Sequence, residues 1–279
     1  MKLDKVTESV FANTQGETGC NVGVIILEDK AVAVDSQFPV SGKDFRKSIE
    51  ALTDKPVTHL LLTHYHGDHI FGVKAFEDCK VVSHRLVKEI MEKNLTTEWA
   101  DPEKMIENIR KNRPERAWLY EGFSMILPTK VFEDRLSLEG EIEMIHTGGH
   151  TAGSSIVHFP KEKVLFAGDL VFAKTFPWAG DPSVDPDVWI EAFKKILDMD
   201  IETIVPGHGP VCEKSEVEVQ LEFFIKTREK MCELIADGAT MEEAVAYDGY
   251  PEFYKSERPQ RRDDSLKQWY RVWTTHKIT

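Results

Sequence analysis

The stretch from residue 57 to residue 69, VTHLLLTHYHGDH, ends with three histidines and an aspartate packed into six residues. The apolar part before them is typical of a buried strand. Neutral imidazoles and a carboxylate are the ligands that borderline divalent metals prefer. A rigid strand that leads into a ligand-rich loop therefore predicts a metal site at residues 64–69.

Three other short apolar runs lead to glycine and to a side chain able to bind a metal. Residues 142–153 contain His150, residues 164–169 end in Gly168-Asp169, and residues 203–210 contain His208. Glycine permits positive φ and a close backbone approach, so the neighbouring side chain can be aimed sharply. Each signal is weak alone. Together they give seven candidate ligands at strand exits, enough for two metals: His64, His66, Asp68, His69, His150, Asp169 and His208.

These motifs occur in a fixed order: His-x-His-x-Asp-His, Gly-Gly-His-Thr-x-Gly, Gly-Asp and Pro-Gly-His-Gly. In that order they resemble the metallo-β-lactamase superfamily, over about residues 5–212. The resemblance implies an α/β fold, a four-layer αββα sandwich. It also implies that Asp35, which matches the first motif of the family, has a structural or supporting role and is not a ligand.

The resemblance further implies how the ligands divide between two metals. One metal would be held by His64, His66 and His150, the other by Asp68, His69 and His208, and Asp169 would bridge them. Three protein ligands and a shared carboxylate leave coordination positions open for water. Open positions indicate a catalytic site, because structural zinc is usually closed by four protein ligands. Zinc is the expected metal, with iron or manganese as alternatives.

Length and patterning predict one large domain with a helical addition. The chain has 279 residues, of which 41% are hydrophobic. We expect a metallo-β-lactamase-like domain over residues 1–214, with a helical insertion at 85–127, and a helical C-terminal extension over 215–279. A flap beside the site and a helical pair anchored by aromatic residues are both compatible with the insertion. For Trp269, Tyr270 and Trp273, packing against the body or another subunit is expected.

Hydrophobic periodicity predicts the individual elements. Helices are expected at residues 43–52, 85–93, 102–111, 186–197 and 215–236. Asp185 is expected to cap the fourth helix, with Pro186 at its first position. Strands are expected at residues 6–11, 22–27, 31–34, 57–62, 80–83, 142–145, 155–159, 163–166 and 203–205.

Charge and composition exclude several partners. A net charge of −13 argues against a nucleic-acid surface, which is normally basic. No apolar stretch approaches the roughly 20 residues of a membrane span, and the start of the chain lacks the apolar region of a signal peptide. The four cysteines have no paired spacing, so we expect free thiols in a cytoplasmic protein, none of them a ligand. The expected partner is a small-molecule substrate, and a homo-oligomer is compatible with the sequence.

The expected chemistry is hydrolysis by a hydroxide that bridges two metals and attacks an ester, lactone, thioester or amide. Asp68 is the expected catalytic residue, as a ligand that also carries a proton. Four residues between the bridging aspartate and the last histidine are expected to line the substrate pocket: Phe172, Lys174, Phe176 and Trp178. The alternative is an oxidoreductase similar to the persulfide dioxygenases of this fold, which use a single iron.

Overall fold

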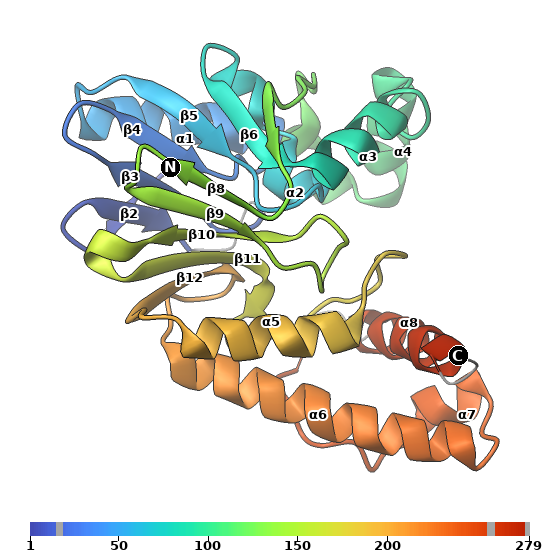
Figure 1. Cartoon of the computed structure of the whole chain (residues 1–279). Helices are drawn as coiled ribbons and strands as arrows, with labels where there is room; N and C mark the ends of the chain where they lie inside the picture. The colour runs from blue at the N-terminus through green and yellow to red at the C-terminus, as the bar shows by residue number, and fades with distance from the viewer. Residues whose placement is uncertain (15–18, 256–259, 277–279) are drawn as a thin grey trace.

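Two β-sheets packed face to face form the centre of the computed structural model, which describes residues 1–14, 19–255 and 260–276 (Figure 1). The first sheet has the strand order β1-β2-β3-β4-β5-β6-β7, and the second has the order β12-β11-β10-β9-β8. The strands of the first sheet are β1 (Asp4–Lys5), β2 (Val10–Asn13), β3 (Val22–Ile26), β4 (Ala31–Val34), β5 (Val57–Leu61), β6 (Lys80–His84) and β7 (Lys130–Phe132). Those of the second are β8 (Arg135–Leu138), β9 (Ile142–His146), β10 (Ser155–Phe159), β11 (Val164–Phe172) and β12 (Thr203–His208).

Helices cover the outer face of each sheet, which confirms the predicted αββα sandwich with a helical C-terminal region. The N-terminal half contributes α1 (Pro39–Leu52), α2 (Gly67–Ile70), η1 (Val73–Phe76), α3 (Arg85–Leu95), α4 (Pro102–Asn112) and η2 (Pro114–Tyr120). The second half contributes η3 (Pro160–Glu162), α5 (Pro186–Asp198), α6 (Lys214–Ala236), α7 (Met241–Ala246) and α8 (Gln260–His276). Asp185 caps α5 through hydrogen bonds from the backbone N–H groups of Asp187 and Val188, as predicted.

Successive side chains of a strand point to opposite faces of the sheet, which explains why each sheet has a hydrophobic layer on both faces. Val32 and Leu61 of the first sheet face Met144 and Val157 of the second across the central core. Their strand neighbours point outward, as Leu60 does toward the core that includes helix α1. Successive residues of one strand therefore serve two different cores, and the sandwich needs both helical layers.

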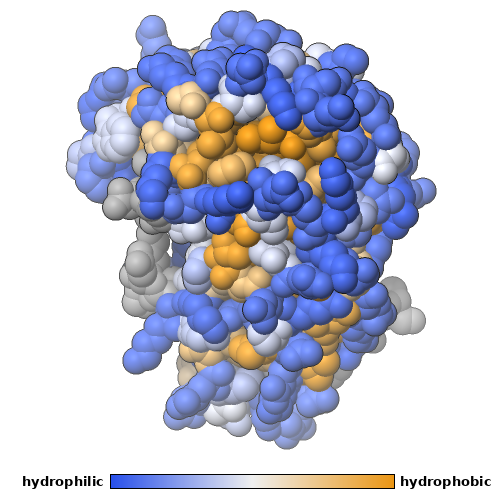
Figure 2. All heavy atoms as spheres, turned by 90° about the vertical axis from the view of Figure 1, so that its left-hand side faces the viewer, coloured by the Kyte–Doolittle hydropathy of each residue, from blue (hydrophilic) through white to orange (hydrophobic). Residues whose placement is uncertain are grey.

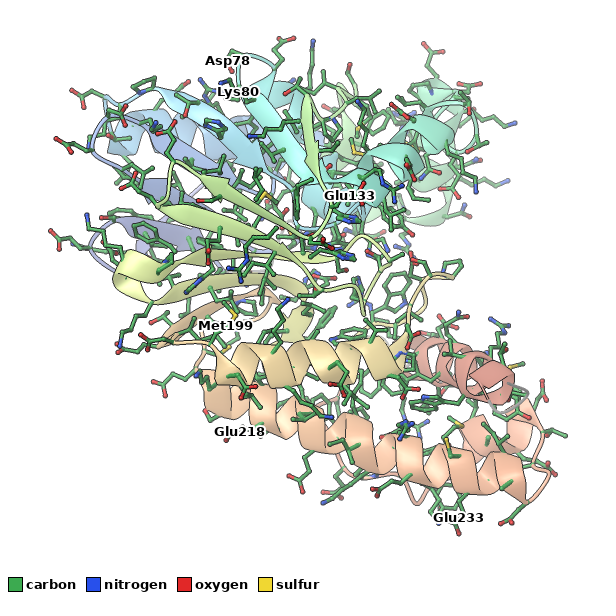
Figure 3. All side chains as sticks on the ribbon, in the orientation of Figure 1. Asp78, Lys80, Glu133, Met199, Glu218 and Glu233 are labelled. Atoms are coloured by element: carbon green, nitrogen blue, oxygen red, sulfur yellow. The ribbon has the colours of Figure 1, made fainter. Side chains whose placement is uncertain are left out.

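The C-terminal helices pack against the second sheet through aromatic side chains. Trp269 and Trp273 of α8 are buried, and the Trp269 ring lies 4.7 Å from that of Phe224 in α6. Glu218 and Glu233 project from the opposite side of α6 (Figure 3). The aromatic tail therefore packs against the body of the protein, which is one of the two expected arrangements.

The strand that carries Asp169 is longer than predicted. We expected a strand over residues 163–166 that ends before Gly168-Asp169, but β11 runs from Val164 to Phe172. Gly168 has a φ of +52° and lies at a register shift between β11 and β12. A Cβ at this position would lie 2.7 Å from Thr63 Oγ1, so only glycine fits. The bulge lets the strand continue while Asp169 turns toward the site.

The first strand is also placed differently. We expected it over residues 6–11, whereas β1 ends at Lys5 and β2 begins at Val10. The backbone N–H groups of Val6 and Thr7 both donate to the Val10 carbonyl oxygen, which closes a turn between the two strands. Of the predicted range 6–11, only Val10 and Phe11 belong to a strand, because the residues before them form this turn.

In residues 85–127, where we expected an insertion, an aromatic side chain packs against the helical layer outside the first sheet. Trp99 is buried, and its ring lies 5.4 Å from that of Phe71. Trp118 stays 49% exposed. The charged face of α3 is outward, where Glu133 pairs with Arg85 at 2.7 Å (Figure 3).

The face shown in Figure 2 is mainly hydrophilic, with a hydrophobic band in its upper part and smaller hydrophobic patches below it. Among residues 1–14, 19–255 and 260–276, no helix combines the length and the apolar content that a membrane span needs.

His84 gives the fold a predictable response to acid. It caps α3 by accepting a hydrogen bond from the Leu86 N–H, and its ring stacks on His146 at 3.9 Å. Burial, together with the neighbouring His146, lowers the pKa of His84 to about 4. Because the folded pKa lies below the unfolded value of about 6.5, the neutral ring's contribution is complete above that value and is lost as the pH falls toward 4.

We therefore expect His84→Asn, which keeps a capping side chain, to reduce the acid sensitivity of the fold. Between pH 7 and pH 5 the wild type should lose about 1 kcal/mol more unfolding free energy than the variant. Denaturant titrations at the two pH values measure this difference. Equal losses in both proteins would show that His84 does not control the response.

Candidate metal centre

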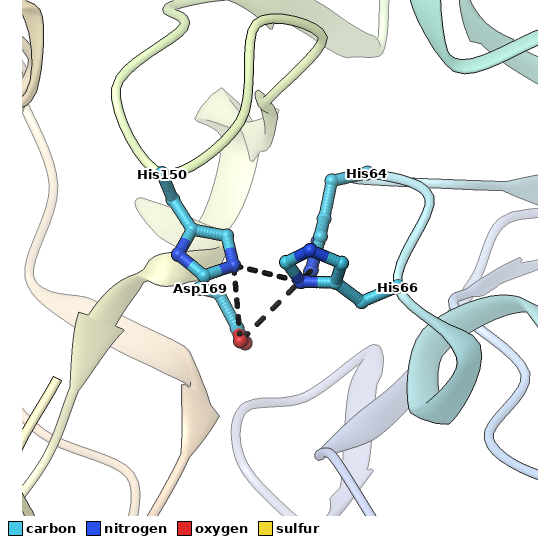
Figure 4. A group of neighbouring side chains, drawn as sticks. All are labelled: His64, His66, His150 and Asp169. Carbon is cyan, nitrogen blue, oxygen red and sulfur yellow. Dashed lines mark hydrogen bonds and ion pairs between the residues drawn. The ribbon is translucent and has the colours of Figure 1, made fainter. Parts of the chain in front are cut away.

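Three histidine rings and one carboxylate converge at the first group of candidate ligands (Figure 4). His66 Nδ1 lies 3.1 Å from His64 Nε2 and 2.9 Å from His150 Nε2. Asp169 Oδ2 is 3.5 Å from His150 Nε2 and 3.9 Å from His64 Nε2. The sequence motifs around residues 64, 150 and 169 therefore meet at one point.

The second group adjoins the first through the other oxygen of Asp169. Asp169 Oδ1 lies 2.9 Å from His69 Nε2 and 3.4 Å from His208 Nε2. Asp68 Oδ2 is 3.4 Å from the same nitrogen of His208. All seven predicted ligands are thus brought together, and one carboxylate faces both groups.

Local backbone features fix the loops that carry these side chains. The Asn21 carboxamide donates to the carbonyl oxygens of Pro206 and Gly209, each at 2.8 Å, and so holds the turn that carries His208. Gly207 is required there, because a Cβ would lie 2.1 Å from Asp169 Oδ1. The end of β12 and the bulge of β11 can therefore approach each other closely.

The donor atoms fit a divalent cation. His69 Nε2 and Asp169 Oδ1 are buried and make no hydrogen bond with any described residue, although they face each other. Ligands at zinc distances in a tetrahedron lie about 3.3 Å apart, which is close to the separations within each group. Buried polar atoms without partners are costly, and a bound cation would satisfy them.

The protonation states of two histidines in the first group also suit ligation. Burial lowers the pKa of His64 well below its ordinary value, and burial lowers the pKa of His150 to about 3. Both imidazoles are therefore neutral near pH 7 and have a lone pair available for a metal.

Comparison with known proteins agrees with this geometry. Residues 15–208 match the family model described as the metallo-beta-lactamase superfamily. The chain belongs to this superfamily. Its relatives include the linear primary-alkylsulfatase of Pseudomonas sp. (strain ATCC 19151), 27% identical over 222 residues that cover 70% of this chain and 41% of the relative. The chain thus spans less than half of that enzyme's length.

A second relative and two solved structures extend the comparison. The beta-lactamase-like protein 2 homolog of Caenorhabditis elegans is 24% identical over 85% of this chain and 73% of its own length. The fold resembles DIM-1 metallo-beta-lactamase, with a TM-score of 0.63, 19% identity and coverage of 80% of this chain and 96% of that one. A double mutant of the sec-alkyl sulfatase PisA1 has a TM-score of 0.77 at 15% identity, and covers 97% of this chain and 50% of that one.

Asp35 orients His69 through the ring nitrogen that faces away from the site. Its Oδ2 accepts a hydrogen bond from His69 Nδ1 at 2.8 Å, and the N–H and hydroxyl of Thr63 donate to the two oxygens of the same carboxylate. A proton held on Nδ1 leaves Nε2 of His69 free to face the site. This is the supporting role that the resemblance implies.

Asp181 supports His66 in the same way, although no sequence motif pointed to it. Its Oδ2 accepts a hydrogen bond from His66 Nε2 at 2.9 Å and a short one from the Tyr65 hydroxyl. Its Oδ1 accepts from the N–H and hydroxyl of Ser183 at 2.7 and 2.6 Å. Burial alone would raise the pKa of Asp181, yet the hydrogen bonds from His66, Ser183 and Tyr65 lower it, so the group is a carboxylate.

We expect Asp181→Asn to weaken metal binding without unfolding the protein. An amide accepts from His66 less strongly than a carboxylate, and loss of such a support typically costs roughly 10- to 100-fold in metal affinity. Competition with a chromophoric chelator measures the effect, with Asp198→Asn on the exposed end of α5 as the control. Wild-type affinity in the Asp181 variant would mean that this carboxylate does not orient His66.

A cavity of about 570 Å³ opens onto the candidate ligands. The Phe172 ring stacks on that of His208 at 5.2 Å, and the Trp178 ring lies 5.1 Å from that of His66. The lining residues are His66, Gly67, Asp68, Arg113, Asp169, Phe172, Trp178, His208, Gln260, Arg261 and Asp264. A slightly larger cavity, about 620 Å³, lies between α5 and α6 and contains none of the seven ligands, so volume alone does not identify the site.

Two of the four residues expected to line the pocket lie elsewhere. Lys174 forms an ion pair with the buried Glu216 at 2.7 Å. Phe176 is buried among the C-terminal helices, with its ring 5.6 Å from that of Phe223. Phe172 is the last residue of β11, and of the three expected residues after it only Trp178 lines the cavity.

Proposed function

We propose that this superfamily member is a metal-dependent hydrolase that binds two divalent cations, with zinc the first candidate and iron or manganese the alternatives. The observation that carries the proposal is the pair of ligand groups joined by Asp169. His64, His66 and His150 would hold one cation, and Asp68, His69 and His208 the other. Each group contains only three side chains besides the shared carboxylate, which leaves room for water and substrate.

Two cations at this centre would supply an acidified water near neutral pH and would stabilise negative charge on a substrate oxygen. The surrounding residues have distinct tasks. Asp35 and Asp181 keep His69 and His66 in one tautomer. Asp68 is the more exposed carboxylate, with 28% of its side chain accessible against 5% for Asp169, and it lines the cavity. We assign Asp68 the transfer of a proton between solvent and the site.

The bond that is cleaved belongs to an ester, a lactone, a thioester or an amide of a small molecule. A cavity of about 570 Å³ has the size of a small-molecule site. The alkylsulfatase among the relatives adds sulfate esters to the group of bonds that deserve testing. In the alternative function, a persulfide dioxygenase with one iron, the second ligand group would bind no metal.

Metal analysis combined with two activity assays tests the proposal. We expect about two divalent ions per chain, turnover in an ester, lactone, thioester, amide and sulfate-ester panel, and a rise in rate with an apparent pKa of about 7. Oxygen uptake with a persulfide, one iron per chain and no hydrolysis would replace the hydrolase with the dioxygenase. A metal-free, fully folded and active protein would contradict both.

Phe176 and Trp178 were both expected to line the pocket, but only Trp178 lines the cavity, so replacing each of them should have a different effect. Trp178→Ala should leave the unfolding free energy nearly unchanged but alter kcat/KM and the preference among substrates. Phe176→Ala should lower the unfolding free energy by about 3–5 kcal/mol because it leaves a cavity in the core. Denaturant titrations and a substrate panel measure both effects. If Phe176→Ala changed the substrate preference and left the unfolding free energy unchanged, Phe176 would line the pocket after all.

A further inference from the structure

Two arginines from distant parts of the chain line the cavity over the candidate metal centre. Arg113 follows the last residue of α4, in the insertion, and Arg261 lies in the first turn of α8. Both belong to the cavity that also contains Asp169 and His208. The metal loops, the insertion and the C-terminal helix therefore all contribute to the same wall.

Neither guanidinium is neutralised by a neighbouring carboxylate. Within residues 1–14, 19–255 and 260–276, Arg113 and Arg261 form no ion pair at 4.0 Å or less. Some other arginines of the chain do: Arg46 pairs with Asp78 at 2.8 Å, and Arg85 pairs with Glu133 at 2.7 Å. Two guanidinium groups that line one cavity and pair with none of its carboxylates remain available to an anionic ligand.

The remaining charges of the cavity reinforce this preference once metals are present. Asp68, Asp169 and Asp264 supply three negative charges and the arginines two positive ones. Two divalent cations would add four positive charges, so the occupied cavity has a net positive charge. A positive cavity with low-dielectric walls concentrates anions.

We propose that Arg113 and Arg261 bind an oxyanion of the substrate, so that the substrate class is an anionic ester and not a neutral one. This inference rests on the proposed function, because it assumes that the cavity holds the substrate. The guanidinium fork matches the oxygen atoms of a sulfate, phosphate or carboxylate. Trp178 supplies an apolar surface in the same cavity for the organic part of the molecule. Arg113 and Arg261 are thus specificity-determining residues, separate from the metal ligands.

Binding of stable probes tests the proposal independently of turnover. Calorimetry with metal-loaded full-length protein would compare 1-octanesulfonate, octylphosphonate and octanoate with neutral 1-octanol. The variants are Arg113→Ala, Arg261→Ala and the double replacement. Arg110→Ala, on the exposed face one turn earlier in α4, and Arg271→Ala, on an exposed part of α8, are matched controls.

We expect at least one anionic probe to bind tighter than octanol, and each single replacement to weaken that probe roughly tenfold or more. Octanol binding and both controls should change less than twofold. The relative affinities of the three anions then distinguish sulfate, phosphate and carboxylate chemistry. Equal affinity for octanol and the anions, no binding of any anion, or unchanged affinity in the double variant would each overturn the inference. Hydrolysis of neutral esters by the same protein would leave the proposed function standing.

Discussion

His66→Ala is expected to lower kcat/KM by roughly a thousandfold, which corresponds to about 4 kcal/mol of transition-state stabilisation. His66 Nδ1 is the atom nearest to both other rings of its group, at 3.1 and 2.9 Å. Without it the first group is left with two histidines and a shared carboxylate. Metal content should fall from about two ions per chain to about one, because the second group keeps all of its side chains.

Elemental analysis and kinetics on the purified variant measure both expected losses. His59→Ala is the control, because His59 lies in β5 next to the same loop but belongs to neither ligand group. Full activity together with full metal content in the His66 variant would contradict the assignment of the first group. Loss of both ions would show that the two groups do not bind independently.

Asp169→Asn is expected to affect both groups at once. Its two oxygens face different groups, since Oδ1 lies near His69 and His208 and Oδ2 lies near His150. An amide has nearly the same shape but lacks the negative charge that stabilises two adjacent cations. We expect the stoichiometry to fall below one and a half ions per chain and kcat/KM to fall roughly a thousandfold or more.

A chelator titration of the Asp169 variant separates this effect from that of His66. The wild type should release its ions in a coupled manner, whereas the variant should bind the remaining ion more weakly at either group. Asp134→Asn, an exposed carboxylate before β8, provides the control for a lost charge. Unchanged binding of both ions would rule out the bridging role of Asp169.

The convergence of the candidate ligands could be predicted from the sequence because much of the information is local. In residues 64–69 the ligands, the glycine and the preceding strand all lie within a few positions of one another. The residues that orient these ligands through hydrogen bonds could not be predicted in the same way. Asp181 and His66 are 115 residues apart in the chain, and no local pattern distinguishes a supporting aspartate from one in an ordinary turn.

The pocket could be predicted only in part, because side-chain direction after a strand depends on tertiary packing. Phe172 and Phe176 are four residues apart and equally apolar, yet one stacks on His208 and the other joins the C-terminal core. The bulge at Gly168 likewise depends on the approach of Thr63 from another strand. That Arg113 and Arg261 line one cavity could not be predicted, since this cavity exists only once α8 has packed.

The position of α8 has a consequence for a chain that is still being synthesised. Every candidate ligand precedes residue 209, whereas Gln260, Arg261 and Asp264 belong to α8, which is synthesised later. A nascent chain can therefore contain a complete set of donors while the space above them is still open to large molecules and to solvent. The side of the cavity that α8 supplies is therefore completed after the donors have been made, and until then nothing on that side limits the size of a molecule that reaches them.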